Sequence, residues 1–338
     1  MTTYAGIDLH SNNIFLGIID SENKRLFSQR LANKLNVIKE ALRPFKQALA
    51  GIAVESTFNW YWLVDGLQDA GYKMHLANPS AIKQYEGIKH RDDRSDAFWL
   101  AQMLMLGILP EGYIYPEKDR PTRDLLRRRM LYVQQRTAHV LSLKGMAQRS
   151  LGGTISTNRI KTLKPEDAEN IFKQRHLSLA GSNAIATIRF LSSQIRSIEK
   201  EVLRYLKIKP EFDHLLTMPG IGNILAMTIM LEVGDINRFP KAGNYASYCR
   251  CVKSERLSNE KKKGVGNRKN GNKYLAWAYV EAANFAIRYN PKAARFYDRK
   301  AARTNNTVAR KALANKMARA SYYIMRDRVA YDEKKIFK

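Results

Sequence analysis

Four acidic residues in the first hundred positions have the spacing of a metal site. Asp8 and Glu55 each end a short apolar run, and Asp93 and Asp96 stand three residues apart, on one face of a helix. A carboxylate at the end of a buried strand is costly unless it binds a cation or a hydrogen-bond donor. Two Mg²⁺ ions about 4 Å apart can activate an attacking oxygen and stabilise a leaving one. If the four side chains converge, they predict a Mg²⁺-dependent phosphoryl-transfer site, with Mn²⁺ as the alternative ion.

The elements that must position these acids form an α/β pattern. We expect, in order, strands at 4–8, 14–19 and 25–30, a helix at 37–45, a strand at 51–55, a helix at 62–70, a strand at 74–77 and a helix at 94–105. Chain order alone does not show whether the strands that carry Asp8 and Glu55 are neighbours. The alternative interpretation has no metal: Asp93 is an N-cap, and Asp8 and Glu55 are loop carboxylates.

The middle of the chain is almost wholly helical. Apolar residues at spacings of three and four predict long helices at 121–149 and 182–207, separated by Gly152, Gly153 and a polar stretch. Two long helices around a polar loop are typical of an antiparallel coiled-coil hairpin, which often serves dimerisation. An ordinary helical bundle is the alternative.

A helix, the sequence Pro-Gly-Ile-Gly and a second helix follow at 215–226. This is the pattern of a helix-hairpin-helix motif. Its glycines, Gly220 and Gly222, would let the backbone approach a phosphate, whose charge then meets the N–H groups of the next helix. The alternative is a turn between two core helices.

Basic residues are concentrated toward the C-terminus. The chain has 58 Lys+Arg and 31 Asp+Glu, a net charge of +27, of which residues 1–110 carry +1, residues 111–249 carry +9 and residues 250–338 carry +17. Such a distribution indicates nucleic-acid binding, with a flexible basic loop at 261–273 that contacts the backbone. The cations that we expect at this interface are Arg127, Arg128, Arg129, Lys261, Lys262, Lys263, Arg268, Lys269 and Lys273.

The composition excludes several other classes. Hydrophobic residues make up 45% of the chain, which excludes a largely disordered protein. No apolar run approaches the length of a membrane helix, and we expect neither a signal peptide nor a membrane partner. The two cysteines, Cys249 and Cys251, are too few for a disulfide framework or a zinc site. We therefore expect a reducing, cytoplasmic setting.

Short motifs in a fixed order resemble a known family. They lie at 6–8 (GID), 54–57 (VEST), 93–97 (DRSDA), 218–222 (MPGIG), 234–239 (GDINRF) and 269–275 (KNGNKYL). The first three resemble the RNase H-like, or RuvC-like, nuclease fold. The whole set resembles the DEDD-type insertion-sequence transposases, which are bridge-RNA-guided recombinases. The resemblance implies a RuvC-like domain at 1–118, a helical coiled-coil region at 119–210 and a basic, mainly helical domain at 211–338.

The resemblance also implies a mechanism. Asp8, Glu55, Asp93 and Asp96 would hold the metal, the DxxDA pattern selecting Asp93 over Asp92. Ser258, or in second place Ser254, would attack DNA and form a covalent phosphoserine. Asn259 follows Ser258 where the family has a glycine, and Asn tolerates left-handed backbone better than most residues.

The family's partners follow from the same resemblance. They are donor and target DNA, a structured guide RNA encoded by the element, and further copies of the chain, as a dimer and as a tetramer in the synaptic complex. Two other functions remain open. One is a junction-resolving nuclease in which metal-activated water attacks DNA, and the other is an architectural DNA- or RNA-binding protein.

Overall fold

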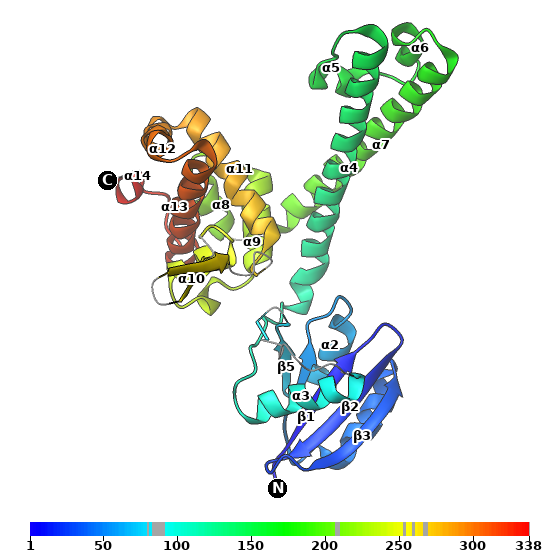
Figure 1. Cartoon of the computed structure of the whole chain (residues 1–338), viewed down its shortest axis with the longest axis vertical. Helices are drawn as coiled ribbons and strands as arrows, with labels where there is room; N and C mark the ends of the chain where they lie inside the picture. The colour runs from blue at the N-terminus through cyan, green and yellow to red at the C-terminus, as the bar shows by residue number, and fades with distance from the viewer. Residues whose placement is uncertain are drawn as a thin grey trace. The chain divides into compact units, whose positions relative to one another are not determined.

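The computed structural model describes residues 1–79, 81–82, 92–206, 210–252, 255–258, 261–265 and 270–337 (Figure 1). The chain forms two compact units, Met1–Glu117 and Lys118–Lys338. The predicted division at 210/211 falls inside the second unit. The domain boundaries at 118 and 210 stay predictions.

The N-terminal unit is an α/β domain built on a mixed sheet. Its strands are β1 (Thr3–Leu9), β2 (Asn13–Asp20), β3 (Arg25–Ala32), β4 (Leu49–Glu55) and β5 (Met74–Ala77). They lie in the order β3-β2-β1-β4-β5, with β1, β4 and β5 parallel and β2 antiparallel to both of its neighbours. The predicted succession of strands and helices is confirmed. This sheet is consistent with an RNase H-like domain.

Helices cover both faces of this sheet. Ile7 packs in one core with α1 (Leu35–Leu42) and α2 (Tyr61–Asp69). The short 3₁₀ helix η1 (Arg43–Phe45) directly follows α1. The opposite face carries α3 (Asp93–Met105), which crosses β1 and β2 (Figure 1). A side chain at Gly6 would overlap the backbone carbonyl oxygen of Ala97, so this glycine sets how closely α3 lies on β1. Residues alternate along a strand, and Asp8 therefore shares the α3 face with Gly6.

The second unit begins, after the 3₁₀ helix η2 (Glu117–Asp119), with an antiparallel pair of long helices, α4 (Arg120–Leu151) and α7 (Arg175–Leu206). Arg129 contacts Glu199 and Arg136 contacts Ser192, so the partner number falls as the residue number rises. Two short helices, α5 (Thr157–Thr162) and α6 (Asp167–Ile171), lie at the far end (Figure 1).

The predicted start of the second long helix at residue 182 is wrong. The helix begins at Arg175 and runs through Gly181, where a side chain would lie 2.9 Å from the ring of Phe172. Gly181 therefore leaves space for the ring of Phe172 to pack against the helix, and it does not end the helix. The predicted polar loop between the long helices contains α5 and α6, whose buried Ile160 and Ala168 pack in the same core as α4 and α7.

The remainder is a helical domain with one small hairpin. Its elements are α8 (Pro210–Leu216), α9 (Asn223–Val233), η3 (Ile236–Arg238), α10 (Ala242–Tyr248), β6 (Glu255–Ser258), β7 (Lys261–Val265), α11 (Lys273–Tyr289), α12 (Pro291–Arg303), α13 (Asn306–Asp327) and α14 (Glu333–Ile336). The prediction of a loop from 261 onward is wrong in part, because Lys261–Val265 pairs with β6 as an antiparallel strand. Among the described residues, no helix combines the length and apolarity needed to cross a membrane.

Candidate active site

Asp8 and Glu55 lie on adjacent parallel strands. Ile7 pairs with Val54 in the register of β1 and β4, so the two acids are the next residues along each strand. Asp8 is buried and Glu55 is half-buried. The adjacency that chain order could not show is therefore present at the carboxyl end of the sheet.

The first turn of α3 supplies the other two acids. Asp92, not Asp93, is the N-cap: its side chain accepts a hydrogen bond of 2.8 Å from the backbone N–H of Ser95. Because Asp92 caps the helix, the carboxylate of Asp93 is available to the end of β1. Asp96 lies three residues after Asp93, also in the first turn of α3.

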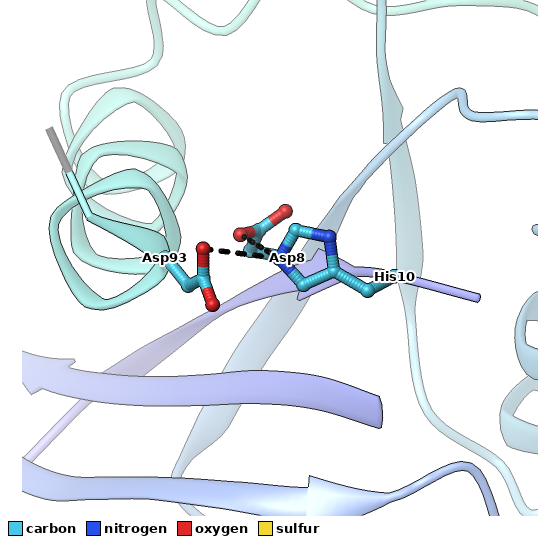
Figure 2. Close-up of side chains that lie close together, drawn as sticks. All are labelled: Asp8, His10 and Asp93. Carbon is cyan, nitrogen blue, oxygen red and sulfur yellow. Dashed lines mark ion pairs between the residues drawn. The ribbon is translucent and has the colours of Figure 1, made fainter. Parts of the chain in front are cut away.

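His10 completes the cluster, and the sequence analysis did not single it out. Its Nε2 lies 3.1 Å from Asp8 Oδ2 and 3.1 Å from Asp93 Oδ1, without hydrogen-bond geometry to either oxygen (Figure 2). One ligand atom from each of the three residues falls within 4.8 Å of the others. Asn33 and Asn59 each donate to the His10 carbonyl oxygen at 3.0 Å, which fixes the backbone here.

Arg30 on β3 is a second residue that the sequence analysis missed. Its Nη2 donates to Asp93 Oδ2 at 2.6 Å, and its Nη1 donates to Asn13 Oδ1 at 3.1 Å. The guanidinium therefore neutralises part of the charge on Asp93 from the outer side of the cluster.

The pKa values of these acids show that the four carboxylates influence one another. Burial raises the pKa of Asp8 to about 6, with repulsion from Asp93, Asp96 and Glu55 adding to it and His10 opposing it. Burial and then repulsion by Asp96 raise the pKa of Glu55. Burial also acts to raise the pKa of Asp93, but the close contact with His10 and the hydrogen bond and charge of Arg30 outweigh it and lower that pKa.

The donor set fits a divalent cation. Carboxylate oxygens are hard ligands suited to Mg²⁺ and Mn²⁺, and an imidazole nitrogen is a further ligand that Mn²⁺ accepts more readily than Mg²⁺. The raised pKa of Asp8 reflects first the cost of burying a carboxylate and then its repulsion by the neighbouring acids, and a bound cation would offset both. Among the described residues, Asp8, His10 and Asp93 each offer a ligand atom close enough to share one ion. That Glu55 and Asp96 also hold the ion stays a prediction.

The predicted serine lies in the other unit. Ser258 ends β6 and pairs in register with Lys261 at the start of β7. Lys261 and Lys263 are exposed on β7, with Lys262 between them in the strand. Ser254, Asn259, Arg268 and Lys269 lie outside the described residues.

The three consecutive arginines of α4 separate into different environments. Arg127 donates from Nε and Nη2 to Glu232 at 2.6 and 2.7 Å, and Arg129 pairs with Glu199 at 2.6 Å. Arg128 is exposed. In the structure two of the three guanidiniums thus bind carboxylates of the same unit. That the three arginines bind nucleic acid stays a prediction.

The glycines of the turn before α9 also differ. Gly220 has φ +90°, and a side chain there would overlap the carbonyl oxygen of Ala282 on α11, so packing within the protein accounts for it. Gly222 is the N-cap of α9 and has open space around it. Lys273, the first residue of α11, is exposed.

Two family profiles match separate parts of the chain. The profile of the DEDD transposases of IS110 type, described as a transposase, matches residues 5–150, and that of the transposase IS116/IS110/IS902 family matches residues 213–298. The first match includes all four acids, and the second includes Ser258.

Curated proteins with similar sequences carry related names. A putative transposase y4qE of Sinorhizobium fredii is 26% identical over 69% of this chain and 57% of its own length. The transposase for insertion sequence element IS1111A of Coxiella burnetii is 22% identical over 68% of this chain and 63% of its own. The transposase for IS1328 of Yersinia enterocolitica is 21% identical over 95% and 96%. The chain thus spans less than two thirds of the first two relatives and nearly all of the third.

The matched profiles agree with the order of the two units and with the acids gathered at the end of the sheet. The chain therefore belongs to the IS110/IS116/IS902 family of transposases, with a DEDD domain at its N-terminus.

Proposed function

We propose that this protein is a DNA transposase that cuts and rejoins strands through the acidic site and Ser258. The observation that carries the proposal is the convergence of Asp8, Glu55 and the first turn of α3 at one edge of the sheet. An architectural binder would gain nothing from carboxylates held together against their repulsion. The names of the relatives support the same reaction class.

Within the acidic site, each residue has a definable task. A bound divalent cation would supply stabilisation of negative charge on the phosphate oxygens. Asp8 and Glu55 would hold it from the strands, and Asp93 and Asp96 from the helix. Arg30 keeps Asp93 ionised and oriented, because its hydrogen bond favours the charged carboxylate.

Ser258 would act as the nucleophile on a DNA phosphodiester. Its Oγ forms a bond to phosphorus, the bond from phosphorus to one deoxyribose oxygen breaks, and the released deoxyribose hydroxyl takes up the serine proton. Attack by a hydroxyl of the incoming strand on the phosphoserine reverses these changes and restores Ser258. Lys261 and Lys263, exposed on the paired strand, would balance charge on the phosphate.

The partners are part of the proposal. The net charge of +17 after residue 249 suits donor and target DNA and a structured guide RNA encoded by the element. The backbone around Gly222 is open enough for a phosphate, as a helix-hairpin-helix motif would require. The antiparallel pair of α4 and α7 would bring copies of the chain together as a coiled coil, in a dimer and in a synaptic tetramer.

Covalent capture tests the nucleophile. The RNA-bound protein, purified from its native host, is mixed with a labelled duplex that carries one end of the element and its flank, and is then denatured. We expect label to migrate with the wild-type chain and not with the Ser258→Ala or Asp8→Asn variants, while Ser254→Ala behaves as wild type. Cleaved DNA without a labelled protein, unchanged in Ser258→Ala, would instead establish attack by metal-activated water.

RNA guidance is tested by washing the purified protein at high salt and sequencing the RNA that stays bound to it. The wash removes non-specific polyanions, because their affinity falls steeply with ionic strength. One dominant structured transcript that maps beside the gene supports RNA guidance. A heterogeneous mixture, or no RNA, contradicts it and leaves DNA alone as the substrate.

A further inference from the structure

The segment that carries Ser258 leaves and re-enters the helical core at one place. The backbone N–H of Asn272 donates to the Tyr248 carbonyl oxygen at 2.6 Å. Arg250 donates from Nε and Nη2 to the Gly271 carbonyl oxygen at 3.1 and 2.8 Å. We call these four residues the clasp. It joins the chain just before β6 to the chain just after β7.

The backbone of the clasp is unusual in a way that its contacts explain. Gly271 has φ +85°, and a side chain there would overlap the Tyr248 carbonyl oxygen. Arg250 has φ +55°, which is uncommon for a residue with a side chain. Such conformations persist when surrounding contacts hold them, here the paired bonds between the two ends of the segment.

Asn272 connects the clasp to the helices. Its Oδ1 accepts hydrogen bonds from the backbone N–H groups of Tyr274 and Leu275 at 2.8 and 3.1 Å, which caps α11. Its Nδ2 donates to Glu232 Oε2 at 2.7 Å. Asn272 is buried, so each of its polar atoms has an assigned partner within the protein.

Glu232 on α9 carries a charge inside this unit. Only 2% of its side chain is exposed, and Arg127 of α4 neutralises it through two hydrogen bonds of 2.6 and 2.7 Å. A buried ion pair contributes little net stability compared with a packed apolar pair, because both charges lose their hydration. The pair does, however, fix the direction in which Glu232 meets Asn272, and with it the position of the clasp.

We propose that Glu232 and Asn272 are positioning residues for the Ser258 hairpin. Arg127 orients Glu232, Glu232 holds the amide of Asn272, and Asn272 holds the Tyr248 end of the clasp. The hairpin formed by β6 and β7 is thereby anchored at both ends. This inference rests on the proposed function insofar as Ser258 is the nucleophile being positioned.

The chain contains a matched control for Asn272. Asn290 caps α12 through bonds to the N–H groups of Lys292 and Ala293 at 3.0 and 2.8 Å, and its Nδ2 donates to Glu333 at 2.8 Å. The two asparagines thus make the same set of bonds, but Asn290 has no bond to the clasp among those of the described residues. Any general effect of altering a capped helix should appear equally at both.

Hydrogen exchange of the full-length protein tests positioning without relying on catalysis. Asn272→Ser keeps a capping oxygen and removes the amide donor, and Asn272→Asp also places a second carboxylate beside Glu232. We expect exchange in peptides covering 255–265 to become roughly tenfold faster in both variants, the scale of one lost buried hydrogen bond. Asn290→Ser and Asn290→Asp should leave these peptides unchanged. Equal exchange in the Asn272 and Asn290 variants would overturn the inference.

The covalent capture assay then connects positioning to chemistry. We expect Asn272→Asp to slow the labelled adduct roughly tenfold at saturating DNA with DNA affinity within about twofold of wild type. The double variant Glu232→Gln with Asn272→Asp reverses donor and acceptor and should recover most of the rate. Affinity and rate falling together, without recovery, would contradict a positioning role. If wild type forms no adduct but exchange still responds only at Asn272, the serine mechanism fails and the anchoring stands.

Discussion

Asp8 and Ser258 are held in place in different ways. Asp8 is the last residue but one of β1, a central strand of a five-stranded sheet, and its neighbours Ile7 and Val54 are fully buried under helices. Ser258 ends one strand of a two-stranded hairpin, a kind of element that is marginally stable alone. Four carboxylates repel one another and need a scaffold that a closed core provides. If Ser258 is the nucleophile, as proposed, it must instead be reached by DNA, and a hairpin held at both ends allows this.

The largest effect should come from the scaffold of the acidic site. In Gly6→Ala the new methyl group would overlap the Ala97 carbonyl oxygen, so α3 must move or the unit must unfold. We expect a loss of at least about 3 kcal/mol in the free energy of unfolding and no detectable Mn²⁺ binding. In Gly17→Ala the methyl would lie 3.0 Å from the ring of Phe98, so that a side chain and not a backbone atom would have to shift, and we expect a smaller loss of stability.

Calorimetric titration with Mn²⁺ and denaturant unfolding of the full chain compare Gly6→Ala with Gly17→Ala. Tryptophan fluorescence suits the unfolding, because Trp60, Trp62 and Trp99 in the N-terminal unit are three of the chain's four tryptophans. Wild-type Mn²⁺ affinity in Gly6→Ala would show that the approach of α3 to β1 does not set the site.

Asp8→Asn should separate stability from activity. The folded protein holds the pKa of Asp8 at about 6, above its ordinary value of 3.8, so between these pH values the folded state binds more protons than the unfolded state. Without metal, the free energy of unfolding therefore falls as pH rises from about 4 to 6 and stays low at pH 7. Asp8→Asn removes this loss and should gain on the order of 2 kcal/mol at pH 7 while abolishing adduct formation.

Urea unfolding at pH 4.5 and pH 7 in a chelator, followed by tryptophan fluorescence, measures the difference. If the free energy of unfolding fell equally from pH 4.5 to pH 7 in Asp8→Asn and in wild type, the raised pKa of Asp8 would not be the cause of the fall.

The sequence predicted the acids and the elements that carry them better than the residues that contact them, His10 and Arg30. Alternating and helical periodicity located the strands and α3, and the resemblance selected Asp93 over Asp92. His10 was within reach, because it stands only two residues after Asp8, directly beyond the end of β1. Arg30 was not, because it meets Asp93 across 63 positions through the order of the sheet, which periodicity does not contain.

The basic residues show the same limit, because a sequence pattern does not contain long-range contacts. Consecutive residues on a helix point about 100° apart, so Arg127, Arg128 and Arg129 cannot form one face. Two of them turn inward to carboxylates 105 and 70 positions away. Composition correctly indicated a basic protein, but a run of like charges did not show which cations are available to a partner.

His10 should decide which metal the acidic site prefers. An imidazole ligand favours Mn²⁺ over Mg²⁺, so His10→Asn is expected to weaken Mn²⁺ binding roughly tenfold and Mg²⁺ binding much less. His75→Asn is the matched control, because His75 also pairs with a carboxylate, Glu111 at 2.8 Å, but on β5. Calorimetric titration of both ions into the three proteins measures the ratio. Equal losses for Mn²⁺ and Mg²⁺ in His10→Asn would make His10 a support for Asp8 and not a ligand.

The smallest effects belong to single cations of the hairpin. Lys261 and Lys263 are both exposed on β7, and each is expected to make one contact with a phosphate. Each substitution to Ala should weaken DNA binding about threefold and reduce the slope of log affinity against log salt by about 1, with the two effects additive. Lys24→Ala, an exposed lysine in the near-neutral N-terminal unit, should change neither. Binding titrations at several salt concentrations measure the slopes. If Lys24→Ala lowered the slope as much as Lys261→Ala, binding would depend on total charge, and the hairpin lysines would not make defined contacts with the DNA.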